Sequence, residues 1–83
     1  MACYLITGGA GFFGSILKKY FLEQGAKCVS IDLEPDNFNH QNFVSYQGDI
    51  NDNVLMDEIF KAHRFDAIFH CAALLAHVKK SCI

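Results

Sequence analysis

The fold of this chain is decided by a glycine-rich stretch near its N-terminus, Ala2-Cys3-Tyr4-Leu5-Ile6-Thr7-Gly8-Gly9-Ala10-Gly11-Phe12-Phe13-Gly14. An apolar run precedes the glycines, which fall at positions 8, 11 and 14 and, in a second reading, at 9, 11 and 14. Strand, glycine-rich turn and helix is the context in which such glycines bind a dinucleotide pyrophosphate. Glycine permits positive φ and close approach of phosphate, and the following helix offers N–H groups and partial positive charge. The stretch therefore predicts a dinucleotide-binding βαβ unit.

The elements around this stretch are predicted from hydrophobic periodicity. Residues 2–6 are predicted as a buried strand, residues 12–24 as a helix that Gly25 ends, and residues 27–32 as a second strand. The apolar face of the helix is predicted to consist of Phe13, Ile16, Leu17, Tyr20 and Phe21. Off that face we expect Lys18, Lys19 and Glu23.

The second half of the chain repeats the alternation of strand and helix. Residues 33–42 have loop chemistry, and residues 43–47 and 66–71 are predicted strands. Between these strands we expect a helix that Asn51 or Asp52 caps and that buries Leu55, Met56, Ile59, Phe60 and His63. The predicted fold is α/β, a partial, doubly wound Rossmann-type domain of about four parallel strands in the order 3-2-1-4. Because the fourth strand would be an apolar edge, residues 1–83 are expected to be one truncated domain of a longer protein.

Composition excludes several classes of function. A net charge of −2 gives no basic surface for nucleic acid, and no apolar run is long enough to span a membrane. The N-terminus lacks the features of a signal peptide. Three of the four cysteines fall in or beside predicted strands, which favours reduced thiols in the cytoplasm over a disulfide framework.

Asp32 is the first candidate binding residue outside the glycines. It follows Gly14 by 18 residues and ends the second predicted strand, near the offset at which a carboxylate accepts hydrogen bonds from the adenosine ribose. A 2′-phosphate would meet this negative charge with no cation from Leu33 or Glu34, which favours NAD over NADP. The alternative is a solvated aspartate at a strand end.

Four signatures in order are Thr7-Gly8-x-x-Gly11-x-x-Gly14, Asp32, Gly48-Asp49-Ile50 and His70-Cys71-Ala72-Ala73. Together they resemble the N-terminal part of the extended short-chain dehydrogenase/reductase family, in its NAD-dependent epimerase/dehydratase branch acting on nucleotide sugars. The resemblance covers the whole chain but roughly the first quarter to third of the family's catalytic unit. It implies a parent oxidoreductase that works by hydride transfer to NAD on a small-molecule substrate, and commonly a homodimer.

The resemblance also implies roles for single residues toward the cofactor. Around the pyrophosphate it places Gly8, Gly11, Phe12 and Phe13, the two phenylalanines through their backbone N–H groups. Gly14, the last glycine of the cofactor-binding pattern, is expected from its lack of a side chain to let the helix pack tightly on its strand. Toward the adenosine ribose it places Asp32 and Leu33, and toward the adenine Asp49 and Ile50. Beneath the cofactor it places Cys71, Ala72 and Ala73. The alternatives are a turn residue for Asp49 and tight packing for the two alanines.

No catalytic residue is predicted within the chain. The family's Ser/Thr and Tyr-x-x-x-Lys pair lie further along, and none of the three tyrosines here has a lysine four residues later. No metal is predicted either, because His70, Cys71, His77 and Cys82 fit no compact zinc spacing. The chain alone is therefore expected to be inactive. Two alternatives stay open: a non-catalytic NAD-binding sensor or assembly module, and a truncated product without independent function.

Overall fold

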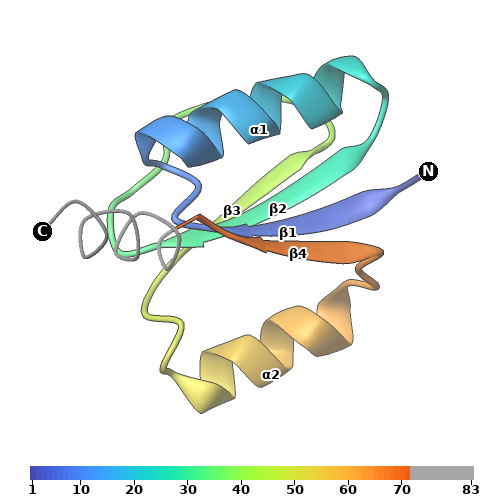
Figure 1. The fold of residues 1–83 in the computed structure, drawn as a ribbon. Helices are drawn as coiled ribbons and strands as arrows, with labels where there is room; N and C mark the ends of the chain where they lie inside the picture. The colour runs from blue at the N-terminus through green and yellow to red at the C-terminus, as the bar shows by residue number, and fades with distance from the viewer. Residues whose placement is uncertain (72–83) are drawn as a thin grey trace, which may run out of the picture.

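The computed structural model describes residues 1–71, which form a parallel four-stranded sheet with one helix on each face (Figure 1). The strand order is β3-β2-β1-β4, and every neighbouring pair is parallel. This confirms the predicted doubly wound α/β class, with β4 at an edge. The elements in chain order are β1 (Cys3–Thr7), α1 (Phe12–Glu23), β2 (Lys27–Asp32), β3 (Phe43–Gln47), α2 (Asn53–Ala62) and β4 (Ala67–His70).

Side chains alternate between two apolar layers, as strand geometry requires. On the α2 face, Leu5, Val29 and Ile31 pack against Ile59, and all four are fully buried. On the α1 face, the core consists of Ile6, Leu22, Cys28 and Cys71. The register places Leu5 opposite Val29 on one side and opposite Ile68 on the other.

The face that α1 buries differs from the prediction by one residue along the helix. The buried line is Gly14, Lys18 and Leu22. Three residues of the predicted apolar face are instead exposed, namely Phe13 at 40%, Ile16 at 52% and Tyr20 at 56%. The reason is that Gly14 lets this line approach the glycine-rich loop closely, and that Lys18 forms an ion pair with Asp36 in the connection between β2 and β3. The prediction that Lys18 lies off the buried face is therefore wrong.

The ends of the helices follow the predicted caps. Asp52 caps α2, because its carboxylate accepts a hydrogen bond of 3.2 Å from the Leu55 N–H, and His63 terminates the helix. After α1, Gly25 has a φ of 82°, which confirms its predicted position just beyond the helix. Phe60 was expected in the core but is 46% exposed, because it lies at the border of the helix face, edge-on to Phe65.

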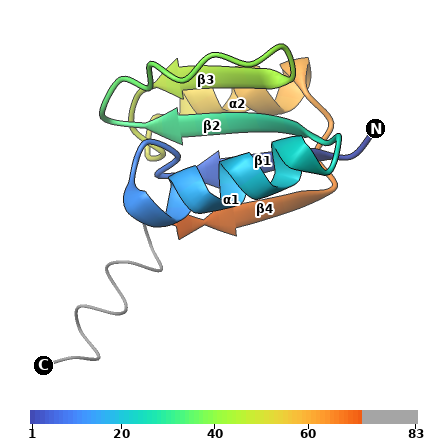
Figure 2. The same cartoon turned by 90° about the horizontal axis from the view of Figure 1, so that it is seen from above.

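The connection between β2 and β3, residues 33–42, contains no helix and runs back along the β3 side of the sheet (Figure 2). Its Phe38 and the first residue of β3, Phe43, pack against the core on the α1 face. This loop therefore covers a part of the sheet that α1 leaves open. No helix among residues 1–71 is long and apolar enough to cross a membrane.

Candidate functional site

Two adjoining cavities lie at the carboxyl end of the sheet, beside the residues that follow β1, β2 and β3. A parallel α/β sheet binds its ligands at this position. The cavities have volumes of about 230 and 190 Å³ and share Gly8 and Asp32. The first is lined by Gly8, Gly11, Phe12, Phe13, Gly14, Asp32 and Cys71. The second is lined by Gly8, Ile31, Asp32, Leu33, Gly48, Asp49 and Ile50.

The glycine-rich loop needs each of its glycines for a different reason. Gly8 has a φ of 72°, which disfavours a side chain. A Cβ on Gly9 would lie 2.4 Å from the Ser30 Cβ, and a Cβ on Gly14 would lie 2.4 Å from the Gly8 carbonyl oxygen. Gly11 is different, because a Cβ there would approach only the Gly8 carbonyl oxygen, at 3.3 Å. Gly8, Gly9 and Gly14 therefore shape the loop, and Gly11 keeps the cavity open.

The N-terminus of α1 faces the first cavity without a side-chain cap. Gly11 is the N-cap residue, and no acidic side chain lies in the first turn. The Ser15 N–H makes a helical hydrogen bond of 2.9 Å to the Gly11 carbonyl, so the N–H groups of the preceding turn have no intrahelical partner. Such a helix end attracts an anionic group through its N–H donors and the helix dipole.

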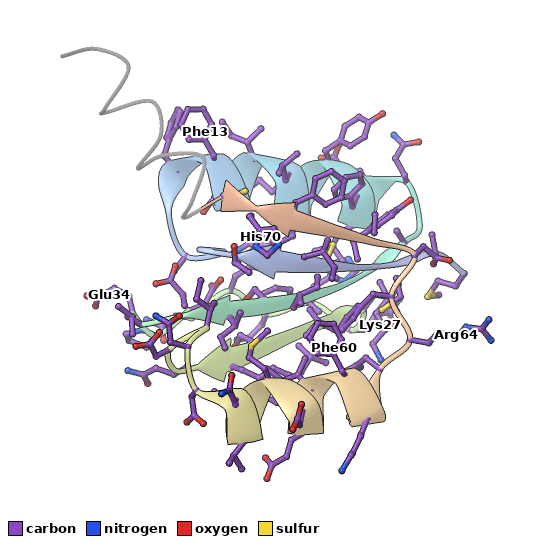
Figure 3. The ribbon with its side chains drawn as sticks, turned by 60° about the horizontal axis from the view of Figure 1, so that its bottom comes forward. Phe13, Lys27, Glu34, Phe60, Arg64 and His70 are labelled. Carbon is purple, nitrogen blue, oxygen red and sulfur yellow. The ribbon has the colours of Figure 1, made fainter. Side chains whose placement is uncertain are left out.

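Asp32 is held where the two cavities meet. One carboxylate oxygen accepts a hydrogen bond of 3.0 Å from the Ala10 N–H, and the other accepts one of 3.0 Å from the Glu34 N–H. A carboxylate oxygen has two lone pairs, so each retains capacity for a further donor such as a ribose hydroxyl. The acid therefore points toward the glycine-rich loop, at the carboxyl end of β2 where Glu34 also projects (Figure 3).

The turn that follows β3 lines the second cavity. Gly48 donates its N–H to the Asp32 carbonyl at 2.9 Å, and a Cβ on Gly48 would lie 2.4 Å from the Leu55 side chain. The Asp49 carboxylate accepts a hydrogen bond of 2.9 Å from the Asn51 N–H. Asp49 is thus a turn residue, as the simpler interpretation expected, and it also lines the cavity.

Cys71 follows β4 and lines the first cavity. It is 5% exposed, and burial raises the pKa of its thiol, so the thiol is neutral near pH 7. Its neighbour His70 is exposed and lies 3.5 Å from the Thr7 hydroxyl through Nδ1. Cys3, Cys28 and Cys71 are free thiols. The predicted cofactor residues Ala72 and Ala73, like His77 and Cys82, lie outside the described residues.

The structure brings the ten remaining predicted residues to these two cavities and adds others. Ile31 and Gly48 line the second cavity, and the Ala10 N–H orients Asp32. Gly48 precedes the predicted Asp49, so a turn after the third strand was the available signal. No sequence pattern indicated Ala10, because its contribution comes from the backbone.

Comparison with known proteins places these features in one family. The sequence pattern that defines the "NAD dependent epimerase/dehydratase family" matches residues 4–82. A UDP-glucose 4-epimerase from Halalkalibacterium halodurans is 41% identical over 71 residues, which cover 83% of this chain and 21% of that protein. A dTDP-D-glucose 4,6-dehydratase from Dictyostelium discoideum is 36% identical over 88 residues, covering 93% of this chain and 20% of that protein.

Solved structures agree in fold. The UDP-glucose 4-epimerase of Thermotoga maritima, determined with UDP-glucose, is 32% identical and superposes with a TM-score of 0.72 over 82% of this chain and 23% of that one. The Bordetella bronchiseptica enzyme WbmH, determined with NAD+, is 31% identical, with a TM-score of 0.77 over 84% of this chain and 25% of that one. The chain spans about a fifth of the length of the curated relatives it matches. On the match of residues 4–82, the chain belongs to the NAD-dependent epimerase/dehydratase family.

Proposed function

We propose that this chain binds NAD, as the cofactor-binding N-terminal part of an epimerase or dehydratase. One observation carries the proposal: the glycine-rich loop, the uncapped N-terminus of α1 and the Asp32 carboxylate meet around one cavity. An adenine dinucleotide presents a pyrophosphate and a ribose diol side by side, and these are the groups that such donors and such an acceptor recognise.

The residues would divide the cofactor between the two cavities. The N–H groups of the first turn of α1, at Phe12 and Phe13, would hold the pyrophosphate, with Gly11 leaving room for it. Asp32, with Leu33 beside it, would accept hydrogen bonds from the adenosine ribose, and the second cavity, with Asp49 and Ile50, would take the adenine. We further propose that Ala72 and Ala73 continue the lining that Cys71 begins.

The charge at Asp32 supports NAD rather than NADP. A 2′-phosphate on the ribose would lie against this carboxylate, and the next residues, Leu33 and Glu34, add no positive charge. Both Asp32 oxygens already accept backbone hydrogen bonds, so the carboxylate is fixed and cannot swing away from a phosphate without losing them.

The whole protein's activity is proposed from its relatives. Those named above are a UDP-glucose 4-epimerase and a dTDP-D-glucose 4,6-dehydratase, so we propose a nucleotide sugar as the substrate. Bound NAD would accept hydride from a sugar carbinol. This segment would bind and orient the cofactor, while proton-transfer residues and a dimer interface would come from other parts of a longer protein. A cytoplasmic location stays a prediction from the cysteine content.

Calorimetric titration of the 83-residue chain with NAD and NADP tests this proposal. We expect saturable binding of NAD and weaker binding of NADP. Gly11→Val should abolish NAD binding, because its side chain would enter the cavity that Gly11 keeps open. Asp32→Ala should remove the preference for NAD, whereas Glu34→Ala, two residues along on an exposed position, should retain it.

Three results would contradict parts of the proposal. NAD binding by Gly11→Val as tight as by the parent chain would exclude this cavity as the pyrophosphate site. An unchanged ratio of NAD to NADP affinity in Asp32→Ala would exclude contact with the ribose. A flat thermal trace by circular dichroism would favour the alternative of a truncated product without independent function. A sensor or assembly module would bind NAD equally well, and a downstream Tyr-x-x-x-Lys pair distinguishes the enzyme from it.

A further inference from the structure

Lys18 is a buried cation that the proposed cofactor contacts do not use. It lies in the middle of α1 with its side chain only 3% exposed. Burying an ammonium group is unfavourable unless it is paired and hydrogen-bonded, so its partners indicate what it holds in place.

The ammonium group connects two loops. Its Nζ lies 2.7 Å from the Asp36 carboxylate, in the connection between β2 and β3, and donates a hydrogen bond of 3.4 Å to the Gly9 carbonyl, in the glycine-rich loop. The rings of Phe38 and Phe43 flank it, with centroids at 4.9 and 4.8 Å. Asp36 is fixed in turn, because its other oxygen accepts the Phe38 N–H at 3.0 Å.

The Gly9–Ala10 peptide is therefore held from both sides. Its carbonyl accepts from Lys18, and its N–H donates to Asp32 at 3.0 Å. A peptide group is planar and trans, so its carbonyl and N–H point in opposite directions, and fixing one fixes the other. Because glycine at position 9 has wide freedom in φ and ψ, the backbone itself does little to fix the orientation of this peptide. Lys18 thus restrains the hydrogen bond that orients Asp32.

We propose that Lys18 and Asp36 are positioning residues of the dinucleotide site, which set the Gly9–Ala10 peptide so that its N–H holds Asp32 toward the cavity. The consequence for affinity rests on the function proposed above. The consequence for the Ala10 N–H does not, because it concerns the chain without ligand.

The alternative is that the pair only fastens the 33–42 loop to α1 and has no effect on Asp32. The double variant Lys18→Met/Asp36→Asn distinguishes this structural role from the positioning role. Replacing both partners of a buried ion pair is commonly neutral for stability, whereas removing one leaves a charge unpaired. Methionine keeps the apolar stem, and asparagine can still accept from the Phe38 N–H. Lys19→Met is the matched control, since it removes the same charge from the exposed neighbouring position.

Two measurements on the 83-residue chain decide. In the ligand-free double variant, the Ala10 amide should exchange hydrogen at least about tenfold faster, with the β1 and β2 amides unchanged. The Kd for NAD should rise about 3- to 10-fold, the effect of one lost hydrogen bond, and stay within about twofold in Lys19→Met.

The inference is overturned if the double variant keeps the Ala10 protection or the NAD affinity of the parent chain. If the parent chain itself binds no NAD, the proposed function fails. The positioning role is then decided by Ala10 exchange alone, with faster exchange supporting it and unchanged exchange overturning it.

Discussion

Gly14→Ala tests how tightly α1 packs on the glycine-rich loop, because helix propensity and packing predict opposite signs. Alanine inside a helix is more favourable than glycine by about 1 kcal/mol, so propensity alone would stabilise the chain. The added Cβ would lie 2.4 Å from the Gly8 carbonyl oxygen and 2.6 Å from the Gly9 Cα. Ordinary carbon contacts are about 3.5–4.0 Å, so helix and loop would have to separate by roughly 1 Å.

Packing should decide the outcome. Overpacking costs about 1–3 kcal/mol and more where rigid backbone is the neighbour, so we expect Gly14→Ala to lose about 2 kcal/mol after the propensity gain. For a domain of this size that lowers the midpoint of a thermal melt, followed by circular dichroism, by roughly 8–16 °C. Gly11→Ala is the control, because its Cβ would meet only the Gly8 carbonyl oxygen at 3.3 Å, and it should melt within about 4 °C of the parent chain. A Gly14→Ala midpoint equal to or above that of the parent chain would show that α1 does not pack closely on the glycine-rich loop.

Three further predictions concern the cap, a thiol and a histidine. Asp52→Ala should lower the free energy of unfolding by about 1 kcal/mol, because it removes the α2 cap; Asn51→Ala should not, and equal losses would contradict the capping role. Burial raises the pKa of Cys28 to about 11, so iodoacetamide at pH 8 should label it at least about tenfold more slowly than Cys3, and comparable rates by peptide mass spectrometry would contradict its burial. Burial lowers the pKa of His63 in the folded chain below its unfolded value of about 6.5. Below that pH the unfolded chain therefore binds more protons than the folded chain. The stability of the fold is unaffected by this group above about pH 6.5 and falls as the pH drops below it. The thermal midpoint should therefore fall less between pH 7 and pH 5 in His63→Gln than in the parent chain, and an equal fall would argue against this role.

Local sequence patterns were enough to predict most of the framework. The predicted bounds of β2 and β3 match the structure, because each is a short segment rich in β-branched, aromatic or other apolar residues with turn residues beside it. At β1 the prediction of residues 2–6 began and ended one residue early. Its end was missed because Thr7 is polar, although it is a fully buried residue of the sheet. The capping residue Asp52 and the terminating Gly25 were predictable because both act on adjacent backbone.

The failures involve partners distant in sequence. Lys18 follows the helical period of a solvated face, and its burial depends on Asp36, in a loop whose path no periodicity specifies. Because α1 directs Gly14, Lys18 and Leu22 toward the sheet, Ile16 and Tyr20 are exposed, although both lie on the predicted apolar face. In the site, side chains such as Asp32 were predictable from spacing. The orientation of Asp32 by the Ala10 N–H could not be predicted, because nearly every residue type carries the same backbone donor.

Titration of the 15N-labelled chain with NAD, followed through its backbone amide signals, shows whether the two cavities bind the dinucleotide. We expect saturable shifts at Gly11, Phe12 and Phe13, which line the first cavity, and at Asp49 and Ile50, which line the second. The amide of Gly25, which lines a separate hollow of about 420 Å³ beside the N-terminal end of β1, should not move. Shifts confined to that hollow, or none at millimolar NAD, would contradict NAD binding in the two cavities.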